Sequence, residues 1–171
     1  MKIRLVEPTL EHEKKALEFK QEFFDNNETV IDGSELLDKT DSYKEWLHSV
    51  TNNARRAASN PDRVLTDTFF AMDEDDAIVG IIDLRYELKG FLIDFGNTGY
   101  SVRPSQRRKG YATEMLRLIK EKAAQSGLST LQLAAERTNY PSVKTILNNG
   151  GVFIRSFVFQ NSQADVYTID L

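Results

Sequence analysis

Apolar residues recur at the helical period of three to four positions in four segments of the chain. These segments predict helices over about 9–24, 43–54, 111–125 and 141–149. The second follows a capping box that runs from Ser42 to Glu45, and the third stops at Gly127, a residue type that commonly ends a helix. The helices therefore have clear start and stop signals.

Runs rich in β-branched and aromatic residues alternate with these helices and predict strands. They lie at 2–6, 67–72, 77–86, 99–102, 130–135, 152–159 and 165–171. Because strands and helices interleave over 99–135, we expect at least one parallel strand pair joined by a crossover helix. The order predicts a mixed α/β fold, with a central twisted mixed sheet of about six to seven strands and four helices on its two faces.

Composition narrows the classes of function. The 171 residues fit one domain, and no repeat or linker divides them. The chain has no cysteine, so disulfides, thiolate metal sites and a cysteine nucleophile are excluded, and no cluster of metal ligands is visible. A net charge of −4 argues against a nucleic-acid partner. We find neither a signal-peptide pattern nor an apolar run of roughly 20 residues, so we expect a cytoplasmic protein without a membrane partner.

The most informative stretch leads from the strand at 99–102 through a basic turn into the helix that begins at Tyr111. The first amides of a helix have no internal partner and lie at the positive end of its dipole, which favours phosphate. Gly110 and Ala112 are small enough to let a ligand approach the backbone. The pattern predicts a diphosphate site, although a solvated basic turn or a small nucleic-acid patch would have the same residues.

Two motifs then resemble the GNAT superfamily of N-acetyltransferases. Arg107-Arg108-Lys109-Gly110-Tyr111-Ala112 matches its R/Q-x-x-G-x-G/A signature, and the strand and turn at 99–104 are similar to the family's fourth strand. The segment 139–151 resembles its N-x-x-A/S helix and the glycine that follows. The resemblance covers about 66–151, with acceptor-side helices at about 9–57. It implies the GNAT fold, with acetyl-CoA as acyl donor.

The resemblance also implies roles for individual residues. Backbone amides from Arg108 to Thr113 would hold the pyrophosphate, and the strand edge would pair with pantetheine and polarise the thioester carbonyl. Residues of the second motif would contact pantetheine or adenosine, unless Asn139 and Ser142 simply cap a helix. The implied cofactor-binding residues are Tyr100, Ser101, Val102, Arg107, Arg108, Lys109, Gly110, Tyr111, Ala112, Thr113, Asn139, Ser142 and Lys144.

The acid and base of the reaction are less well marked. Ile146 stands where many family members have a proton-donating tyrosine, and it cannot donate a proton. Tyr140 and Tyr167 are alternative acids, while Glu136, Asp94 or a water chain are alternative bases. By position and charge, the residues expected to attract a cationic amine acceptor are Asp32, Glu35 and Asp38.

We therefore expect an acetyl-CoA-dependent N-acetyltransferase that transfers acetyl directly to the amine of a small molecule or peptide, without a metal. One alternative is a catalytically inactive CoA-binding sensor with the same fold. Another is an anion- or nucleic-acid-binding domain that uses the basic turn. Both a monomer and a homodimer paired through the final strands are open.

Overall fold

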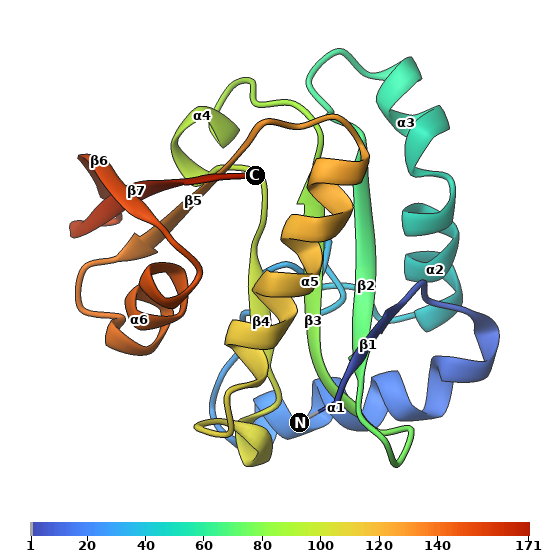
Figure 1. Cartoon of the computed structure of the whole chain (residues 1–171). Helices are drawn as coiled ribbons and strands as arrows, with labels where there is room; N and C mark the ends of the chain where they lie inside the picture. Colours follow the sequence, from blue (N-terminus) through green and yellow to red (C-terminus); the bar gives the residue numbers. More distant parts are fainter. Residues whose placement is uncertain (1) are drawn as a thin grey trace.

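The computed structural model describes residues 2–171 and shows a mixed α/β arrangement, as predicted (Figure 1). The first elements are β1 (Arg4–Val6), the 3-10 turn η1 (Leu10–His12), α1 (Glu13–Asp25), α2 (Tyr43–Thr51), α3 (Asn53–Ser59), β2 (Thr66–Met72) and β3 (Ile78–Arg85). The chain continues with α4 (Leu92–Phe95), β4 (Tyr100–Val102), the turn η2 (Pro104–Gln106), α5 (Tyr111–Gln125), β5 (Thr130–Glu136), α6 (Tyr140–Asn148), β6 (Val152–Phe159) and β7 (Ser162–Asp170).

The strands form two antiparallel sheets instead of one mixed sheet. Their orders are β1-β2-β3-β4 and β5-β7-β6. The expected parallel pair is wrong, since β4 and β5 share no ladder. Within residues 2–171, the backbone bonds between these two segments lie just ahead of β4, where Gly96 bridges Leu133 and the Asn97 amide donates to the Gln132 carbonyl at 2.7 Å. From this point the two strands separate (Figure 1).

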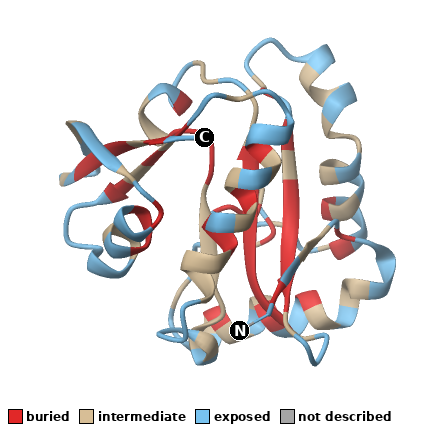
Figure 2. Ribbon diagram, viewed as in Figure 1, coloured by how far each residue is buried: buried red, intermediate tan, exposed pale blue. Residues whose placement is uncertain are grey.

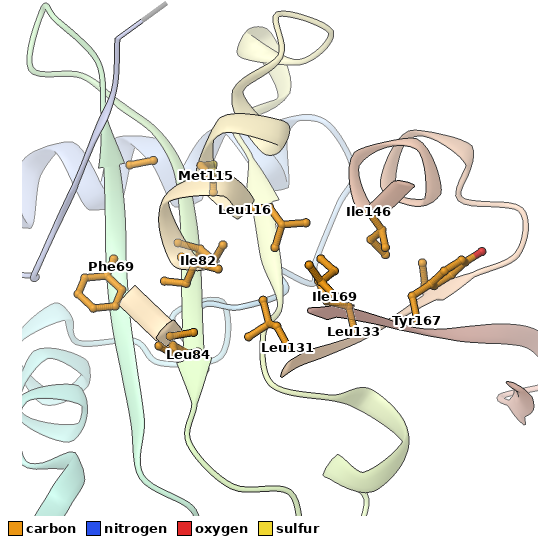
Figure 3. Packing of buried hydrophobic residues seen from close by; sticks show 14 of the residues in the cluster. Phe69, Ile82, Leu84, Met115, Leu116, Leu131, Leu133, Ile146, Tyr167 and Ile169 are labelled. Carbon is orange, nitrogen blue, oxygen red and sulfur yellow. The ribbon is translucent and has the colours of Figure 1, made fainter. Parts of the chain in front are cut away.

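Helix α5 holds the two sheets together by packing on one face of both. Met115 and Leu116 of α5 lie in one continuous core with Ile82 of β3 and Leu131 of β5 (Figure 3). A second core, built on α1 and α2, covers the opposite face of the first sheet around Phe70. The first sheet is thus buried on both faces, whereas much of β6 is exposed (Figure 2).

Most element boundaries agree with the sequence patterns. Helix α5 spans the predicted 111–125, and the Ser42 hydroxyl accepts the Glu45 amide at 3.3 Å, as the capping box requires. The second predicted helix ends earlier, at Thr51, and a short α3 follows in which Ala54 is exposed. The single-turn α4 was not predicted, because four residues are too few to show a helical period.

Candidate functional site

The turn before α5 presents a row of free backbone amides. Arg108 and Gly110 adopt left-handed conformations, with φ of 61° and 85°, and Lys109 between them does not. Such alternation points successive N–H groups to one side and builds an anion-binding concavity. Within residues 2–171, none of the six amides from Arg108 to Thr113 donates to a protein acceptor. The start of α5 is therefore a preformed donor site for an anion.

Two carboxylates of the α1 region hold this turn in place. Arg107 forms a bidentate pair with Glu28, at 2.7 and 2.6 Å, and its Nε donates to the Val102 carbonyl at 3.1 Å. These hydrogen bonds lower the pKa of Glu28, which keeps the pair ionic. On the other side of the turn, the Ser105 amide donates to Glu22 Oε1 at 2.7 Å. The charge of Arg107 is thus neutralised within the fold, and the exposed Arg108 and Lys109 supply the positive charge at the mouth.

Strand β4 has one open edge, which faces β5. The Arg103 amide donates to the Val79 carbonyl at 2.9 Å, so the odd-numbered residues of this segment bond to β3. Backbone groups alternate in an antiparallel pair, and those of Tyr100 and Val102 therefore point to the open edge. Since Arg107 already occupies the Val102 carbonyl, the Val102 N–H is the free donor nearest the turn.

The Tyr100 side chain spans the space between the sheets. Its hydroxyl lies 2.9 Å from Ser142 Oγ on α6, and burial raises the pKa of this phenol to about 12. It therefore stays protonated at neutral pH. Ile146, one turn further along α6, is fully buried in the core near Tyr167 (Figure 3). The sequence named Tyr100 only for its backbone, and nothing in the pattern marked its hydroxyl.

The start of α6 carries a side-chain cap. Asn139 Oδ1 accepts the Ser142 amide at 3.3 Å, which confirms that Asn139 caps this helix. Lys144 is exposed, and Tyr140 is 73% exposed at the first turn. The Ser142 hydroxyl is the group of this motif that reaches the space between the sheets, through its contact with Tyr100.

The loop between α1 and α2 is fixed against β4 on the other side. The Ser101 hydroxyl donates to the Asp32 carbonyl at 2.9 Å, and Trp46 Nε1 donates to the Ser34 carbonyl at 2.8 Å. A Cβ on Gly33 would lie 2.1 Å from the Gly99 carbonyl oxygen, so only glycine permits this approach. The loop therefore places its carboxylates beside β4.

Three carboxylates lie close to one another at the gap between β4 and β5, and they come from both sides of it. Desolvation raises the pKa of Asp32, and the Asp38 and Glu136 carboxylates raise it further, while Arg85 opposes them. Glu136 belongs to β5, whereas Asp32 and Asp38 belong to the loop beside β4. The cluster would attract a cation, and the raised pKa makes Asp32 a stronger base than an ordinary aspartate. The predicted Glu35 acts on Asp83 instead.

Asp83 of β3 supports the segment that leads into β4. It is fully buried, its Oδ1 accepts the Gly99 amide at 2.6 Å, and its Oδ2 lies 2.7 Å from Arg85 without the alignment of a hydrogen bond. Burial raises the pKa of Asp83 to about 6. The Asp83 carboxylate thus ties the start of β4 to β3.

Comparison with protein families identifies this arrangement. The model of the acetyltransferase (GNAT) family matches residues 33–149, which is more than half of the chain. The chain belongs to the GNAT acetyltransferase family. The matched range contains β4, the turn before α5 and the cap of α6, which are the elements that build the site. A comparison with curated protein sequences finds no match.

Solved structures with this GNAT fold align over almost the whole chain. RimL, a ribosomal L7/L12 α-N-protein acetyltransferase in complex with coenzyme A, is 11% identical with a TM-score of 0.71, covering 99% of this chain and 94% of RimL. MccE, a microcin C7 self-immunity acetyltransferase in complex with acetyl-CoA and AMP, is 14% identical with a TM-score of 0.70, covering 99% and 92%. YncA from Salmonella typhimurium, with acetyl-CoA, is 13% identical with a TM-score of 0.66, covering 99% and 93%. At these identities the likeness shows the fold.

The three candidate catalytic residues of this GNAT chain do not gather at one place. Glu136 shares its surroundings with Asp32 and Asp38. Asp94 lies on α4, where it forms a 2.7 Å ion pair with Arg155 of β6. Tyr140 points to solvent. The geometry therefore retains Glu136 beside the gap and separates the other two from it.

Other features of the described residues bear on ligands. Between residues 2 and 171, we find no helix with the length and apolar character needed to cross a bilayer, and no group of three or more histidine or acidic side chains arranged to hold a metal. A shallow hollow of about 390 Å³ lies between α1 and η2. Because Glu22 and Asp25 line that hollow, it would repel an anion, in contrast to the amides of the neighbouring turn.

Proposed function

We propose that this chain is an acetyl-CoA-dependent N-acetyltransferase that passes an acetyl group directly to the amine of a cationic acceptor. The observation that carries the proposal is the run of six unpaired amides from Arg108 to Thr113, held by Arg107 and Glu28 at the open end of β4. Family membership supports the reaction class. RimL, MccE and YncA have the same fold and were solved with CoA or acetyl-CoA, which supports the donor.

The residues of the turn fit the phosphates of the donor. Backbone N–H groups with two left-handed positions form a concave donor surface, and Arg108 and Lys109 add positive charge beside it. Lys144, Asn139 and Ser142 line the α6 side, where the adenosine or pantetheine portion would lie. The open edge of β4 offers the Val102 N–H to an extended chain. Acetyl-CoA supplies an acetyl thioester, the activated form of the group to be moved.

Proton handling falls to residues on both sides of the gap. We assign the proton donor for the departing sulfur to Tyr100, because its hydroxyl lies in the space between the sheets beside Ser142 and Ile146 has no proton to give. We assign the role of the base that accepts the amine proton to Asp32 or Glu136. The two lie near enough for the charge of Glu136 to raise the pKa of Asp32. The N–H of Val102 would stabilise negative charge on the carbonyl oxygen. The cationic amine first gives one proton to the carboxylate and becomes neutral. Its nitrogen then bonds to the acetyl carbon as the bond to sulfur breaks, and the departing sulfur takes the Tyr100 proton. The second proton leaves the acylated nitrogen and returns to the Tyr100 phenolate, so that an amide, a free thiol and a protonated carboxylate remain.

The acidic cluster supports a cationic acceptor over a neutral or anionic one. An amine in water is protonated, so three carboxylates would concentrate it at the gap before one of them takes its proton. RimL acts on a protein N-terminus, as its name states, which supports a peptide amine as one form of acceptor for this chain. A small polyamine or an amino acid fits the same charges.

A panel of amines with thiol detection tests the function. Purified protein with acetyl-CoA is expected to release free thiol in the presence of cationic amines and to release little with neutral or anionic compounds. Thiol release with every amine at the rate of the protein-free control would contradict the proposal. Binding of acetyl-CoA without any turnover would favour the alternative, a CoA-binding sensor.

A further inference from the structure

Four phenylalanines form an aromatic patch where α4 packs on the second sheet (Figure 1). Phe95 of α4 is at its centre, and its ring centre lies 6.0 Å from that of Phe91, 5.5 Å from that of Phe157 and 4.9 Å from that of Phe159. Within residues 2–171, the two buried cores include none of these rings. Phe91 is 71% exposed and Phe159 is 39% exposed. The aromatic patch is therefore partly open to solvent.

A bulge in β6 directs two of these rings to the face of α4. The register of β6 against β7 shifts between Phe153 and Arg155. Before the shift, Phe153 lies opposite Tyr167 of the core that contains α6, with ring centres 6.1 Å apart. Regular alternation would place Phe157 on that same face, yet Phe157 and Phe159 pack on α4. Bulges commonly redirect side chains beside functional sites.

The carboxylates of the gap lie on the same face as the aromatic patch. Glu136 of β5 lies opposite Ala164 of β7, and Ala164 lies opposite Phe157 of β6. Directly opposed residues point to one face of a sheet, so the side chains of Glu136 and Phe157 project on the same side. Two strand spacings, about 10 Å, separate their backbones. The row therefore joins the patch to one end of the acidic cluster.

Arg85 of β3 joins the patch to the other end of the cluster. Its Nη1 donates to the carbonyl of Gly96 at 3.1 Å, and Gly96 directly follows Phe95. The charge of the same guanidinium lowers the pKa of Asp32. The segment that carries Phe95 is thus fixed beside Asp32, and the aromatic rings and the carboxylates border one region.

We propose that the acceptor is a primary amine joined by a short aliphatic linker to an aromatic ring, with its ammonium at Asp32 and Glu136 and its ring against the aromatic patch. This inference rests on the proposed function and specifies its acceptor. Aromatic rings pack edge-on with centres about 5 Å apart, which is roughly half the separation between Phe157 and Glu136, and the linker spans the rest. A free arylalkylamine and a peptide that begins with phenylalanine share this chemistry.

An aromatic amine fits this region better than a polyamine. Arg155 and Asp94, the charged pair beside the patch, lie 2.7 Å apart and neutralise each other. The second ammonium of a polyamine would therefore meet apolar rings in place of a carboxylate. An aromatic ring instead removes its own surface, and that of Phe91 and Phe159, from water.

Steady-state kinetics with matched amines test the acceptor class. Phenylethylamine, butylamine and putrescine are all cationic at neutral pH, and the first alone has a ring. Its kcat/KM is expected to be about tenfold higher than that of the other two, because one face of the ring leaves water. Phenylalanyl-alanine amide against alanyl-alanine amide is the peptide pair, and a preference in one pair only identifies the source. Equal efficiency within both pairs would overturn the inference and leave N-acetyl transfer intact.

Substitutions on β6 test the aromatic patch. Phe157→Ala is expected to lower the ratio of kcat/KM for phenylethylamine over butylamine from about ten to about one. Phe153→Ala is the matched control, since Phe153 is on the same strand, is 51% exposed and lies on the opposite face, and it should keep the ratio. The ratio does not depend on the amount of folded protein, and Phe159→Ala is a second variant. An equal loss of the ratio in Phe153→Ala would overturn the inference.

Calorimetric titration tests the same surface without turnover. Protein saturated with CoA is expected to bind phenylethylamine about tenfold more tightly than butylamine, and Phe157→Ala should remove this difference. Thiol release at the protein-free rate with every amine would contradict the proposed transferase, and the titration would still decide on the patch. Equal affinity of the wild-type protein for the two amines would overturn the inference in either case.

Discussion

Two of the edge strands of this molecule, β4 and β6, differ in almost every respect except that each has an unpaired backbone edge. The β4 edge has three residues and faces β5 inside the gap, beside free amides and a protonated phenol. The β6 edge has eight residues, faces solvent and is flanked by exposed apolar side chains. In both, alternate N–H and C=O groups await a partner. The surroundings of each edge therefore decide which partner it can take.

The difference concerns size and polarity. A three-residue edge between two sheets accepts one thin extended chain, and the neighbouring amides favour an anionic end on that chain. The eight-residue edge on the surface is interrupted by a bulge between Phe153 and Arg155, which disrupts the regular row of backbone groups that another strand would need. We propose the acyl donor as the partner of the β4 edge.

Removing one N–H from each edge gives the largest expected difference. Val102→Pro deletes the outward donor of β4 without touching the ladder to β3, and should lower kcat by about 1000-fold, as for other lost oxyanion donors. Val158→Pro deletes an outward donor of β6, and should leave the turnover unchanged. Thiol release by both variants measures the contrast. Equal activity loss in the two variants would mean that the proline acts through general destabilisation.

Removal of the Tyr100 hydroxyl beside β4 should have the next largest effect. Tyr100→Phe should lower kcat by about 100-fold, because it removes a proton donor, and should change the affinity for acetyl-CoA only slightly. A thioester donor with a more acidic leaving thiol should restore much of the rate, since that thiol needs no proton to depart. Steady-state kinetics with both donors, beside calorimetry of acetyl-CoA binding, separate a proton donor from a packing residue. A rate loss that is the same with both donors would contradict the assignment.

Two buried aspartates, Asp83 near β4 and Asp165 beside β6, should make contributions to stability that change in opposite directions with pH. The pKa of Asp83, raised to about 6 by burial, exceeds the unfolded value of 3.8, so the folded state retains this proton between the two values. Its contribution to stability is complete below the unfolded pKa and is lost as the pH rises through about 6, by between about 1 and 3 kcal/mol. Urea unfolding from pH 4 to pH 7 should show this decline in the wild type but not in Asp83→Asn.

Asp165, beside β6, provides the matched case. Hydrogen bonds from Arg137 lower the pKa of Asp165, so its contribution to stability is present above the unfolded pKa and is lost as the pH falls through the lowered value. Asp165→Asn should therefore remove stability at neutral pH and leave the decline attributed to Asp83 in place. The same pH series of unfolding curves checks both variants.

The smallest expected effect concerns the acceptor. Asp38→Asn should raise the KM for a cationic amine about fivefold at low salt, because it removes one charge from the cluster around the gap. Glu35→Gln should have less effect, since Glu35 acts on Asp83 and not on Asp32. Kinetics at two ionic strengths measure the difference. A larger effect from Glu35→Gln would place the acceptor elsewhere.

The sequence predicted the class of fold and the position of the anion-binding turn for local physical reasons. Helix α5 and the cap at Asn139 depend on periodicity and on neighbours a few residues away. The separation of β4 from β5 depends on contacts between Asn97 and Gln132, which are 35 positions apart and have no local signal. For that reason one mixed sheet was expected and two antiparallel sheets are observed.

Long-range contacts also set the parts of the site that sequence could not specify. The bond between Tyr100 and Ser142 and the pair between Arg107 and Glu28 join segments 42 and 79 positions apart. Because of these contacts Tyr100, which was expected to act through its backbone, is a candidate acid. Arg107, which was expected to bind phosphate, instead supports the turn. The roles of Glu136, Asp32 and the other predicted site residues stay predictions until they are tested by substitution.

Calorimetric titration with acetyl-CoA tests the central claim most directly. The wild-type protein is expected to bind acetyl-CoA with micromolar or tighter affinity, and Gly110→Trp is expected to lose this binding because the indole covers the free amides. Gly127→Trp is the matched control, since Gly127 also has a left-handed conformation, at the opposite end of α5, and should bind as the wild type does. Equal binding by Gly110→Trp and Gly127→Trp, or no binding by folded wild-type protein, would contradict the account.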